Sequence, residues 1–186
     1  MAEVHIGNDT RLNRIVAIKI LRQDLARDPV FQARFRREAQ SAANLNHPSI
    51  VAVYDTGEET ITASDGTEVK VPYIVMEYVE GHTVRELLTD GNPVPLEEAV
   101  EIVSGVLDAL EYAHHQNLVH RDIKPGNVMI TTTGKIKVMD FGIARALSDS
   151  QATMTQTDAV VGTAQYLSPE QARGEQVDAR SDLYSA

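Results

Sequence analysis

The sequence contains no cysteine, so disulfide bonds, thiolate zinc sites and thiol catalysis are excluded for these 186 residues. Basic residues are also few: Lys and Arg total 17 against 27 Asp and Glu, which gives a formal net charge of −10. A broad nucleic-acid-binding surface is therefore not expected. No apolar run approaches the roughly 18 residues of a membrane helix, and the first five residues do not resemble a signal peptide. We expect a cytoplasmic segment that contacts neither nucleic acid nor a membrane.

The composition, 42% hydrophobic and 24% charged, is typical of a globular chain. The pattern of hydrophobic residues changes near Gly81, from mainly β-strand spacing before it to mainly helical spacing after it. Before that point we expect strands over 15–21, 50–54 and 73–79, a helix over 29–45 and a polar hairpin loop over 58–70. After it we expect helices over 83–88 and 96–115, small strands over 127–130 and 135–139, and a polar mobile loop over 148–159. The stripe that helix 96–115 should bury contains Ala99, Val103, Val106, Leu110 and Ala113. The pattern predicts an α+β fold.

Two charged residues fall on positions that should face the core. Lys19 lies in the apolar strand 15–21, and Glu38 lies within the apolar stripe of the helix over 29–45. Removing one partner of a buried ion pair typically costs about 3–5 kcal/mol, so such charges need partners. The two residues could pair with each other, or each could extend its charged end to solvent. Periodicity alone does not choose between these two arrangements.

Four short motifs occur in a fixed order. They are Val16-Ala17-Ile18-Lys19, His120-Arg121-Asp122 followed by Asn127, Asp140-Phe141-Gly142, and Ser168-Pro169-Glu170. This order resembles the protein kinase family, with its V-A-I-K, H-R-D-x-x-x-x-N, D-F-G and A-P-E signatures, except that serine replaces the alanine of the last one. Glu38 falls where the family has the glutamate of its helix C. The whole chain is similar to bacterial serine/threonine kinases of the actinobacterial protein kinase B type.

The resemblance implies a two-lobed protein-kinase-like fold. Residues 1–79 would form a small β-rich N-lobe with helix C, and residues 80–186 would form part of a mainly helical C-lobe that ends at the start of helix F. It also implies a serine/threonine protein kinase that uses ATP with Mg²⁺ or Mn²⁺ and acts on Ser or Thr hydroxyls of protein substrates.

The resemblance assigns a role to each polar motif residue. Asp122 would accept the proton of the substrate hydroxyl, a contribution commonly worth about 10²–10⁴-fold. Lys124 would contact the transferred phosphate. Lys19 would hold the α- and β-phosphates, with Glu38 fixing the lysine. Asn127 and Asp140 would supply oxygen ligands to the metal.

Further positions would bind the adenine or regulate the enzyme. The adenine would meet the backbone at Glu77 and Val79, the gatekeeper Met76, and the apolar side chains of Val4, Ala17 and Met129, although apolar residues at these places would equally suit a core strand. Thr155 and Thr157 lie where relatives autophosphorylate, and Arg121 would bind such a phosphate. An unregulated solvated loop is the alternative. Thr163 would contact the catalytic Asp and Lys.

The ends of the sequence depart from the family pattern. Ala2 and Val4 match the end of the glycine-rich loop, whose first two glycines and preceding strand are missing. Residues 180–185 match the start of helix F, where Asp182 should bond the catalytic-loop backbone. Glu170 would lack its arginine partner, and helix 96–115 would be under-covered on one side. We therefore expect a fragment of a longer kinase, with impaired activity.

Several expectations concern the longer protein or a different function. The parent could be anchored in the cell membrane by a segment outside this chain, and relatives suggest a homodimer formed through the N-lobe. One alternative is a non-catalytic, pseudokinase-like module that binds nucleotide or a partner. Another is a small-molecule phosphotransferase, which the segment 162–170 disfavours because that segment positions a protein substrate.

Overall fold

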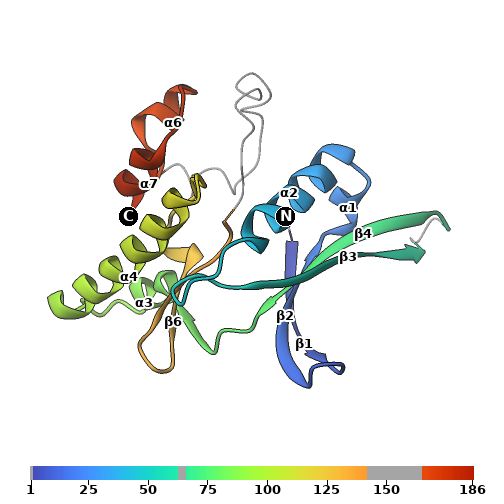
Figure 1. Ribbon diagram of the computed structural model, residues 1–186, viewed down its shortest axis with the longest axis horizontal. Coiled ribbons are helices and arrows are strands. Elements are labelled where there is room, and N and C mark those ends of the chain that lie inside the picture. The colour runs from blue at the N-terminus through green and yellow to red at the C-terminus, as the bar shows by residue number, and fades with distance from the viewer. Residues whose placement is uncertain (1, 63–65, 142–164) are drawn as a thin grey trace. The chain divides into compact units, whose positions relative to one another are not determined.

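The computed structural model describes residues 2–62, 66–141 and 165–186 (Figure 1). The chain forms two compact units. Unit 1 comprises Met1–Asn46 and Val51–Val79, and unit 2 comprises His47–Ile50 and Glu80–Ala186.

Unit 1 is built on a four-stranded antiparallel sheet with the order β1-β2-β4-β3. The strands are β1 (Ala2–Asp9), β2 (Arg14–Leu21), β3 (Val53–Thr62) and β4 (Glu68–Glu77). Strand β1 was not expected from the sequence. It pairs along its whole length with β2, whose β-branched residues suit a buried strand.

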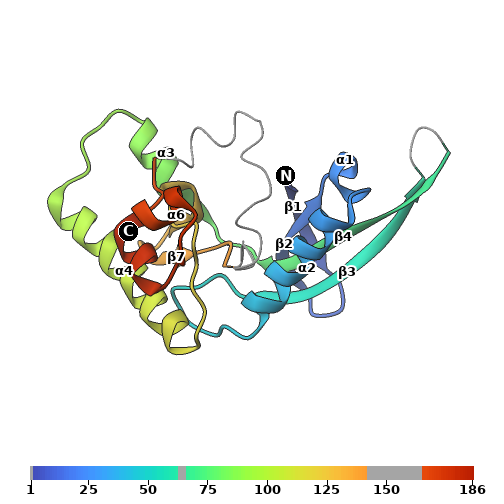
Figure 2. The same ribbon diagram turned by 90° about the horizontal axis from the view of Figure 1, so that it is seen from above.

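The polar segment 58–70 is mostly strand, so its prediction as a loop was wrong. Strands β3 and β4 extend through it as a long ribbon, visible in Figure 2, and pair from Thr62 with Glu68 onward. Strand β3 lies at the edge of the sheet, where charged and polar side chains remain in solvent. Because most side chains of this edge strand are polar and exposed, its composition is the same as that of a loop, and composition alone predicted a loop.

Helices α1 (Gln23–Ala26) and α2 (Pro29–Ala43) pack against this sheet. The α2 helix begins where predicted because Asp28 accepts a hydrogen bond from the Val30 backbone N–H and Pro29 occupies the first helical position. The shared core is formed by Leu21, Ala26, Phe35, Ala39, Val69, Val71 and Ile74.

Unit 2 contains a three-stranded sheet of order β5-β6-β7, formed by Gly81–Thr83, Val128–Thr131 and Ile136–Val138. Within its described residues, the helices are α3 (Val84–Thr89), α4 (Leu96–His115), the 3₁₀ turn η1 (Pro125–Asn127), α6 (Pro169–Arg173) and α7 (Ala179–Ser185). Gly81 has φ +158°, and a Cβ there would lie 2.0 Å from the Ile130 carbonyl oxygen, so only glycine fits this position.

The α4 helix has the predicted bounds, but its buried stripe is rotated from the predicted one. The buried residues are Ile102, Val106, Ala109, Leu110 and Ala113. Val103 was predicted to be buried and is 41% exposed, and the neighbouring Val100 is 55% exposed. In the part of the chain that the structure describes, one apolar side of α4 is thus uncovered.

No helix within the described ranges is long and apolar enough to cross a membrane.

Candidate active site

The segment His120–Asn127 connects α4 to β6 and is held by a buried aspartate of α7. Asp182 is 1% exposed. Its Oδ2 accepts the His120 backbone N–H at 2.8 Å, and its Oδ1 accepts the Arg121 N–H at 2.6 Å. A carboxylate that accepts two backbone N–H groups makes strong, charge-assisted hydrogen bonds. The expected contact between Asp182 and this loop is therefore present.

Two residues in this region have left-handed backbone conformations. Arg121 has φ +69° and Asp140 has φ +63°. Such conformations cost of order 1 kcal/mol or more in residues other than glycine and persist only where surrounding contacts enforce them. Each lies in a motif that the sequence singled out. The hydrogen bond that the Arg121 N–H donates to Asp182 helps to enforce this conformation at Arg121.

The His120 side chain is fully buried and links the loop to the segment after β7. Its Nε2 lies 3.0 Å from the Met139 carbonyl oxygen, and its Nδ1 accepts the Asp122 N–H at 3.2 Å. Its ring meets Phe141 edge-on with centroids 4.6 Å apart. Burial lowers the pKa of His120 below its ordinary value, against the opposing effect of the Met139 carbonyl and nearby carboxylates. Nδ1 is thus the accepting nitrogen of the ring, and Nε2 is the nitrogen that donates to the Met139 carbonyl.

The Asp122 carboxylate gathers two side-chain donors. Its Oδ2 accepts the Lys124 ammonium at 2.6 Å and the Asn127 amide nitrogen at 3.1 Å. The same amide nitrogen donates to the Asp122 backbone carbonyl at 2.8 Å. The structure thus brings together three of the residues that the motif predicted, within one short loop.

Asp140 lies two residues after the end of β7. The Met139 N–H donates to the Asn127 carbonyl at 3.0 Å, so the backbones next to the two predicted metal ligands are hydrogen-bonded. Within the described ranges, no group of three or more His, Asp or Glu side chains could by itself hold a metal ion. Magnesium commonly takes only one or two protein ligands and completes its shell with phosphates and water.

In unit 1, the two charges that the sequence placed in the core form an ion pair. Lys19 Nζ on β2 lies 2.6 Å from Glu38 Oε1 on α2, and each side chain is 13% exposed. The pairing alternative is confirmed, and the solvent-directed alternative was wrong for both residues.

Three of the predicted adenine residues of unit 1, Val4, Ala17 and Met76, lie on the sheet face that carries Lys19. Val4 is directly opposite Lys19 in the register of β1 and β2, and Ala17 is opposite Met76 in that of β2 and β4. Directly paired residues point to the same side of a sheet. Ala17 and Met76 are buried, whereas Val4 is 59% exposed. One apolar surface thus lies beside the ammonium group.

The remaining predicted adenine positions are divided between the units. In unit 1, Glu77 ends β4 and its N–H donates to the Ala52 carbonyl at 2.8 Å, while Val79 is buried. In unit 2, Met129 is half-buried on β6 between its partners Thr83 and Lys137.

Two predicted regulatory positions are described and three are not. Thr155, Thr157 and Thr163 lie outside the described residues. Glu170, expected without its arginine, accepts a hydrogen bond from the Ser181 hydroxyl, which lowers the pKa of this carboxyl. Arg121 adjoins Asp122 as the motif requires.

Sequence reasoning missed two side chains that contact this loop or its anchor. His114 Nε2 lies 2.8 Å from Asp182 Oδ2, and Gln171 Nε2 donates to the Arg121 carbonyl at 2.7 Å. His114 offered no signal beyond its place in the last turn of α4. Gln171 did offer one, because Ser168 and a Gln three residues later form the pattern of a helix capping box.

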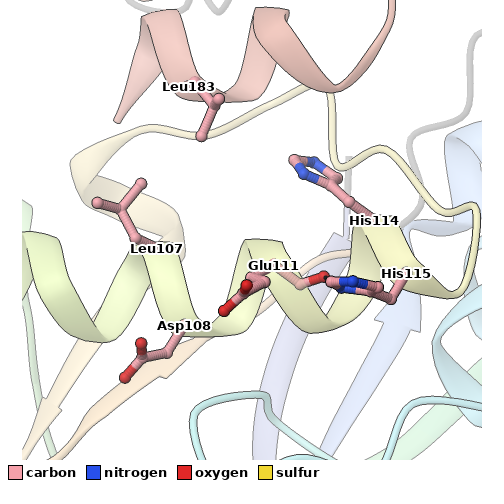
Figure 3. A pocket seen from close by; sticks show the side chains of 6 residues that line it. All are labelled: Leu107, Asp108, Glu111, His114, His115 and Leu183. Carbon is pink, nitrogen blue, oxygen red and sulfur yellow. Dashed lines mark hydrogen bonds between the residues drawn. The ribbon is translucent and has the colours of Figure 1, made fainter.

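An open pocket lies between α7 and the C-terminal half of α4, the half that carries His114 (Figure 3). It is lined by Leu107, Asp108, Glu111, His114, His115 and Leu183. None of the predicted site residues lines it, so this pocket is separate from the catalytic motif.

These features define the class of protein. The family model for the protein kinase domain matches residues 1–186, and the chain belongs to the protein kinase family. The predicted α+β kinase fold is confirmed by solved structures: the PknI kinase domain of Mycobacterium tuberculosis has a TM-score of 0.72 and 35% identity over all of this chain and 65% of that one.

Curated relatives make the likeness more specific. A probable serine/threonine-protein kinase of Streptomyces coelicolor is 68% identical over 185 residues, covering 100% of this chain and 27% of that protein. The serine/threonine-protein kinase PknB of Mycobacterium leprae is 60% identical and is covered over 29% of its length. The predicted resemblance to the actinobacterial protein kinase B type is confirmed. The chain spans under a third of the length of these relatives.

Proposed function

We propose that the protein containing this chain transfers the γ-phosphate of ATP to Ser or Thr hydroxyls of protein substrates. The observation that carries the proposal is the arrangement around Asp122, whose carboxylate is held by Lys124 and Asn127 in a loop anchored by Asp182. Family membership and relatives named as serine/threonine kinases support the same reaction.

Asp122 is the proton acceptor of this proposal. As the substrate oxygen bonds to the γ-phosphorus, its O–H bond breaks, the proton passes to the Asp122 carboxylate, and ADP leaves with the electrons of the broken P–O bond. Lys124 holds the carboxylate oriented and places a positive charge beside the transferred group. Positioning and charge stabilisation supply most of the catalysis in phosphoryl transfer.

The donor chemistry of unit 2 fits a divalent cation. Asn127 uses its amide nitrogen for both hydrogen bonds to Asp122, which leaves its amide oxygen as the end suited to a metal. Asp140 contributes a carboxylate, and hard oxygen ligands of this kind suit Mg²⁺ or Mn²⁺. Such an ion would neutralise phosphate charge when bound. Lys19, fixed by Glu38, would bind the α- and β-phosphates.

Nucleotide recognition and regulation complete the proposal. The adenine would contact Val4, Ala17, Met76, Glu77, Val79 and Met129, as proposed from their place in the family pattern. We further propose that Thr155 and Thr157 are autophosphorylated and that Arg121 binds the resulting phosphate. Thr163 would contact Asp122 and Lys124, and Glu170, which accepts the Ser181 hydroxyl, would hold α6 to α7.

The partners and location remain part of the proposal. We propose protein substrates, a homodimer formed through unit 1, and a cytoplasmic location for this segment, with any membrane anchor elsewhere in the protein. The acidic net charge of −10 supports the absence of a nucleic-acid partner.

The test is phosphate transfer from labelled ATP to a generic protein substrate, made with the full-length protein. Asp122→Asn should reduce kcat by at least about 10²-fold. Asp108→Asn, which removes the same charge from an exposed position on α4, is the matched control and should retain activity. Equal activity in the Asp122→Asn variant and the unmodified protein would reject catalysis at this site. ATP binding without any transfer by the unmodified protein would favour the pseudokinase-like alternative.

A further inference from the structure

The backbone of Arg121 is held through both of its peptide groups, one before and one after its Cα. Its N–H donates to Asp182 Oδ1 at 2.6 Å, and the carbonyl of the same residue accepts Gln171 Nε2 at 2.7 Å. Arg121 has φ +69° and directly precedes Asp122. A residue in this conformation needs contacts that enforce it. Asp182 and Gln171 together supply them.

The same glutamine also caps α6. Gln171 Oε1 accepts the Ser168 N–H at 3.0 Å, while the Gln171 N–H lies 3.4 Å from Ser168 Oγ. This is a capping box, in which the two ends of the first turn satisfy each other. The side chain therefore uses its oxygen within α6 and its nitrogen on the catalytic loop. A primary amide can accept through its oxygen and donate through its nitrogen at the same time without charge.

Both supports of Arg121 rest on α7. Asp182 belongs to that helix. The Ser181 hydroxyl of α7 donates to Glu170 on α6, and Ser185 Oγ donates at 2.6 Å to the carbonyl of Tyr166, which lies just before α6. Asp182, Arg121, Gln171, Glu170 and Ser181 thus form a closed series of contacts. A change at Gln171 would act on the Arg121 backbone without touching the nucleotide or the substrate hydroxyl.

We propose that Gln171 is a positioning residue for Asp122, acting through the Arg121 carbonyl. The inference rests on the proposed function, since Asp122 is taken there as the proton acceptor. The effect should fall on the chemical step: loss of the Gln171 donor loosens the loop that aims the carboxylate, while Lys19, the predicted adenine residues and the metal ligands remain unchanged.

Gln171→Glu separates the two tasks of the side chain. A glutamate at this position retains the capping-box acceptor and is favourable in the first turn of a helix, but it turns an acceptor toward the Arg121 carbonyl. In the full-length protein we expect kcat to fall about tenfold or more, the KM for ATP to stay within about twofold, and the thermal midpoint to stay close to that of the unmodified protein. Gln176→Glu, an identical change at an exposed position, is the matched control.

Gln171→Lys tests the other task of the side chain, the capping of α6. It keeps a donor for the Arg121 carbonyl and loses the cap acceptor, so the thermal midpoint should fall while kcat stays within about threefold. The proposal is overturned if Gln171→Glu has the kcat of the Gln176→Glu control, or if both Gln171 variants lose kcat only in proportion to their stability.

Backbone hydrogen exchange over 120–123 gives a readout that does not require activity. Exchange should be faster in Gln171→Glu than in Gln176→Glu, because the Arg121 carbonyl, which shares a peptide group with the Asp122 N–H, loses its donor. If the unmodified protein transfers no phosphate, the proposed function fails, and this exchange difference still decides whether Gln171 holds the loop. Equal exchange in the two variants would overturn the inference alone.

Discussion

The ammonium of Lys19 lies 2.6 Å from the carboxylate of Glu38, and the two residues belong to different elements, β2 and α2. Each side chain is largely buried, so each offsets part of the cost of burying the charge of the other. The distance between α2 and the sheet thereby sets the position of the lysine that is proposed to bind phosphate.

The first prediction concerns this pair. Glu38→Ala should lower the free energy of unfolding by about 3 kcal/mol, because it leaves a buried ammonium without its carboxylate. The double variant Lys19→Met, Glu38→Leu should regain most of that stability, since apolar residues of similar volume replace both charges. It should still fail to bind ATP. Urea denaturation and titration with a fluorescent ATP analogue measure the two properties. ATP binding by the stable double variant would contradict the role proposed for Lys19.

The second prediction concerns the outer side of α2. Arg36 pairs with Glu58 on β3, with side chains 48% and 31% exposed, and so ties the helix to the long β3–β4 ribbon. A pair this exposed is worth about 0.2–1 kcal/mol. Arg36→Glu should lower the free energy of unfolding by up to about that amount, and Arg36→Glu with Glu58→Arg should restore it. The effect should shrink in 1 M salt, where exposed charges are screened. No recovery in the double variant would show that the pair contributes nothing.

The sequence was most informative where periodicity and charge agreed. The α4 helix was predicted with its bounds because its apolar residues recur at helical spacing after Pro95. The Lys19–Glu38 pair was one of two alternatives from the pattern alone, and the family resemblance favoured it. Strand β3 could not be recognised because its pairing with β4, and not its composition, makes it a strand.

The candidate site was predictable only in part. The motif identified Asp122, Lys124 and Asn127, which the structure brings together. It did not identify Gln171, because the bond of this residue to Arg121 joins segments fifty residues apart in the sequence. Contacts between distant backbone and side-chain groups leave no periodic signal. The burial error at Val103 has a similar cause, because the side of α4 that is covered depends on where β7 lies.

The third prediction concerns pH. Because burial lowers the pKa of His120 in the folded chain, the unfolded chain binds more protons once the pH falls below the ordinary value of 6.5. The free energy of unfolding should therefore fall as the pH drops from 6.5 toward 5, by at most about 1.4 kcal/mol per pH unit from this group. Above pH 7 the same group should contribute no slope.

His120→Phe provides the comparison for that pH dependence. Phenylalanine retains a ring against Phe141 but cannot titrate, and it loses the bonds to Met139 and Asp122. The variant should be less stable at pH 7.5 and should show a shallower loss between pH 6.5 and 5 in urea denaturation. An unchanged slope would mean that other groups, such as the remaining histidines, cause the acid sensitivity.

The fourth prediction concerns the packing of α4 on β7. Gly105 lies in the middle of α4, and a Cβ there would be 2.6 Å from the Ile136 Cβ and 2.7 Å from its Cγ1. Alanine ordinarily stabilises a helix interior by about 1 kcal/mol relative to glycine. Here the added methyl forces the helix away from a buried strand, an overpacking that typically costs about 1–3 kcal/mol. Gly105→Ala should therefore lower the free energy of unfolding. Ser104→Ala, at the exposed neighbouring position, should raise it by about 0.5 kcal/mol. Urea denaturation of the two variants measures the difference. A gain in stability from Gly105→Ala equal to that of Ser104→Ala would show that α4 does not approach Ile136 this closely.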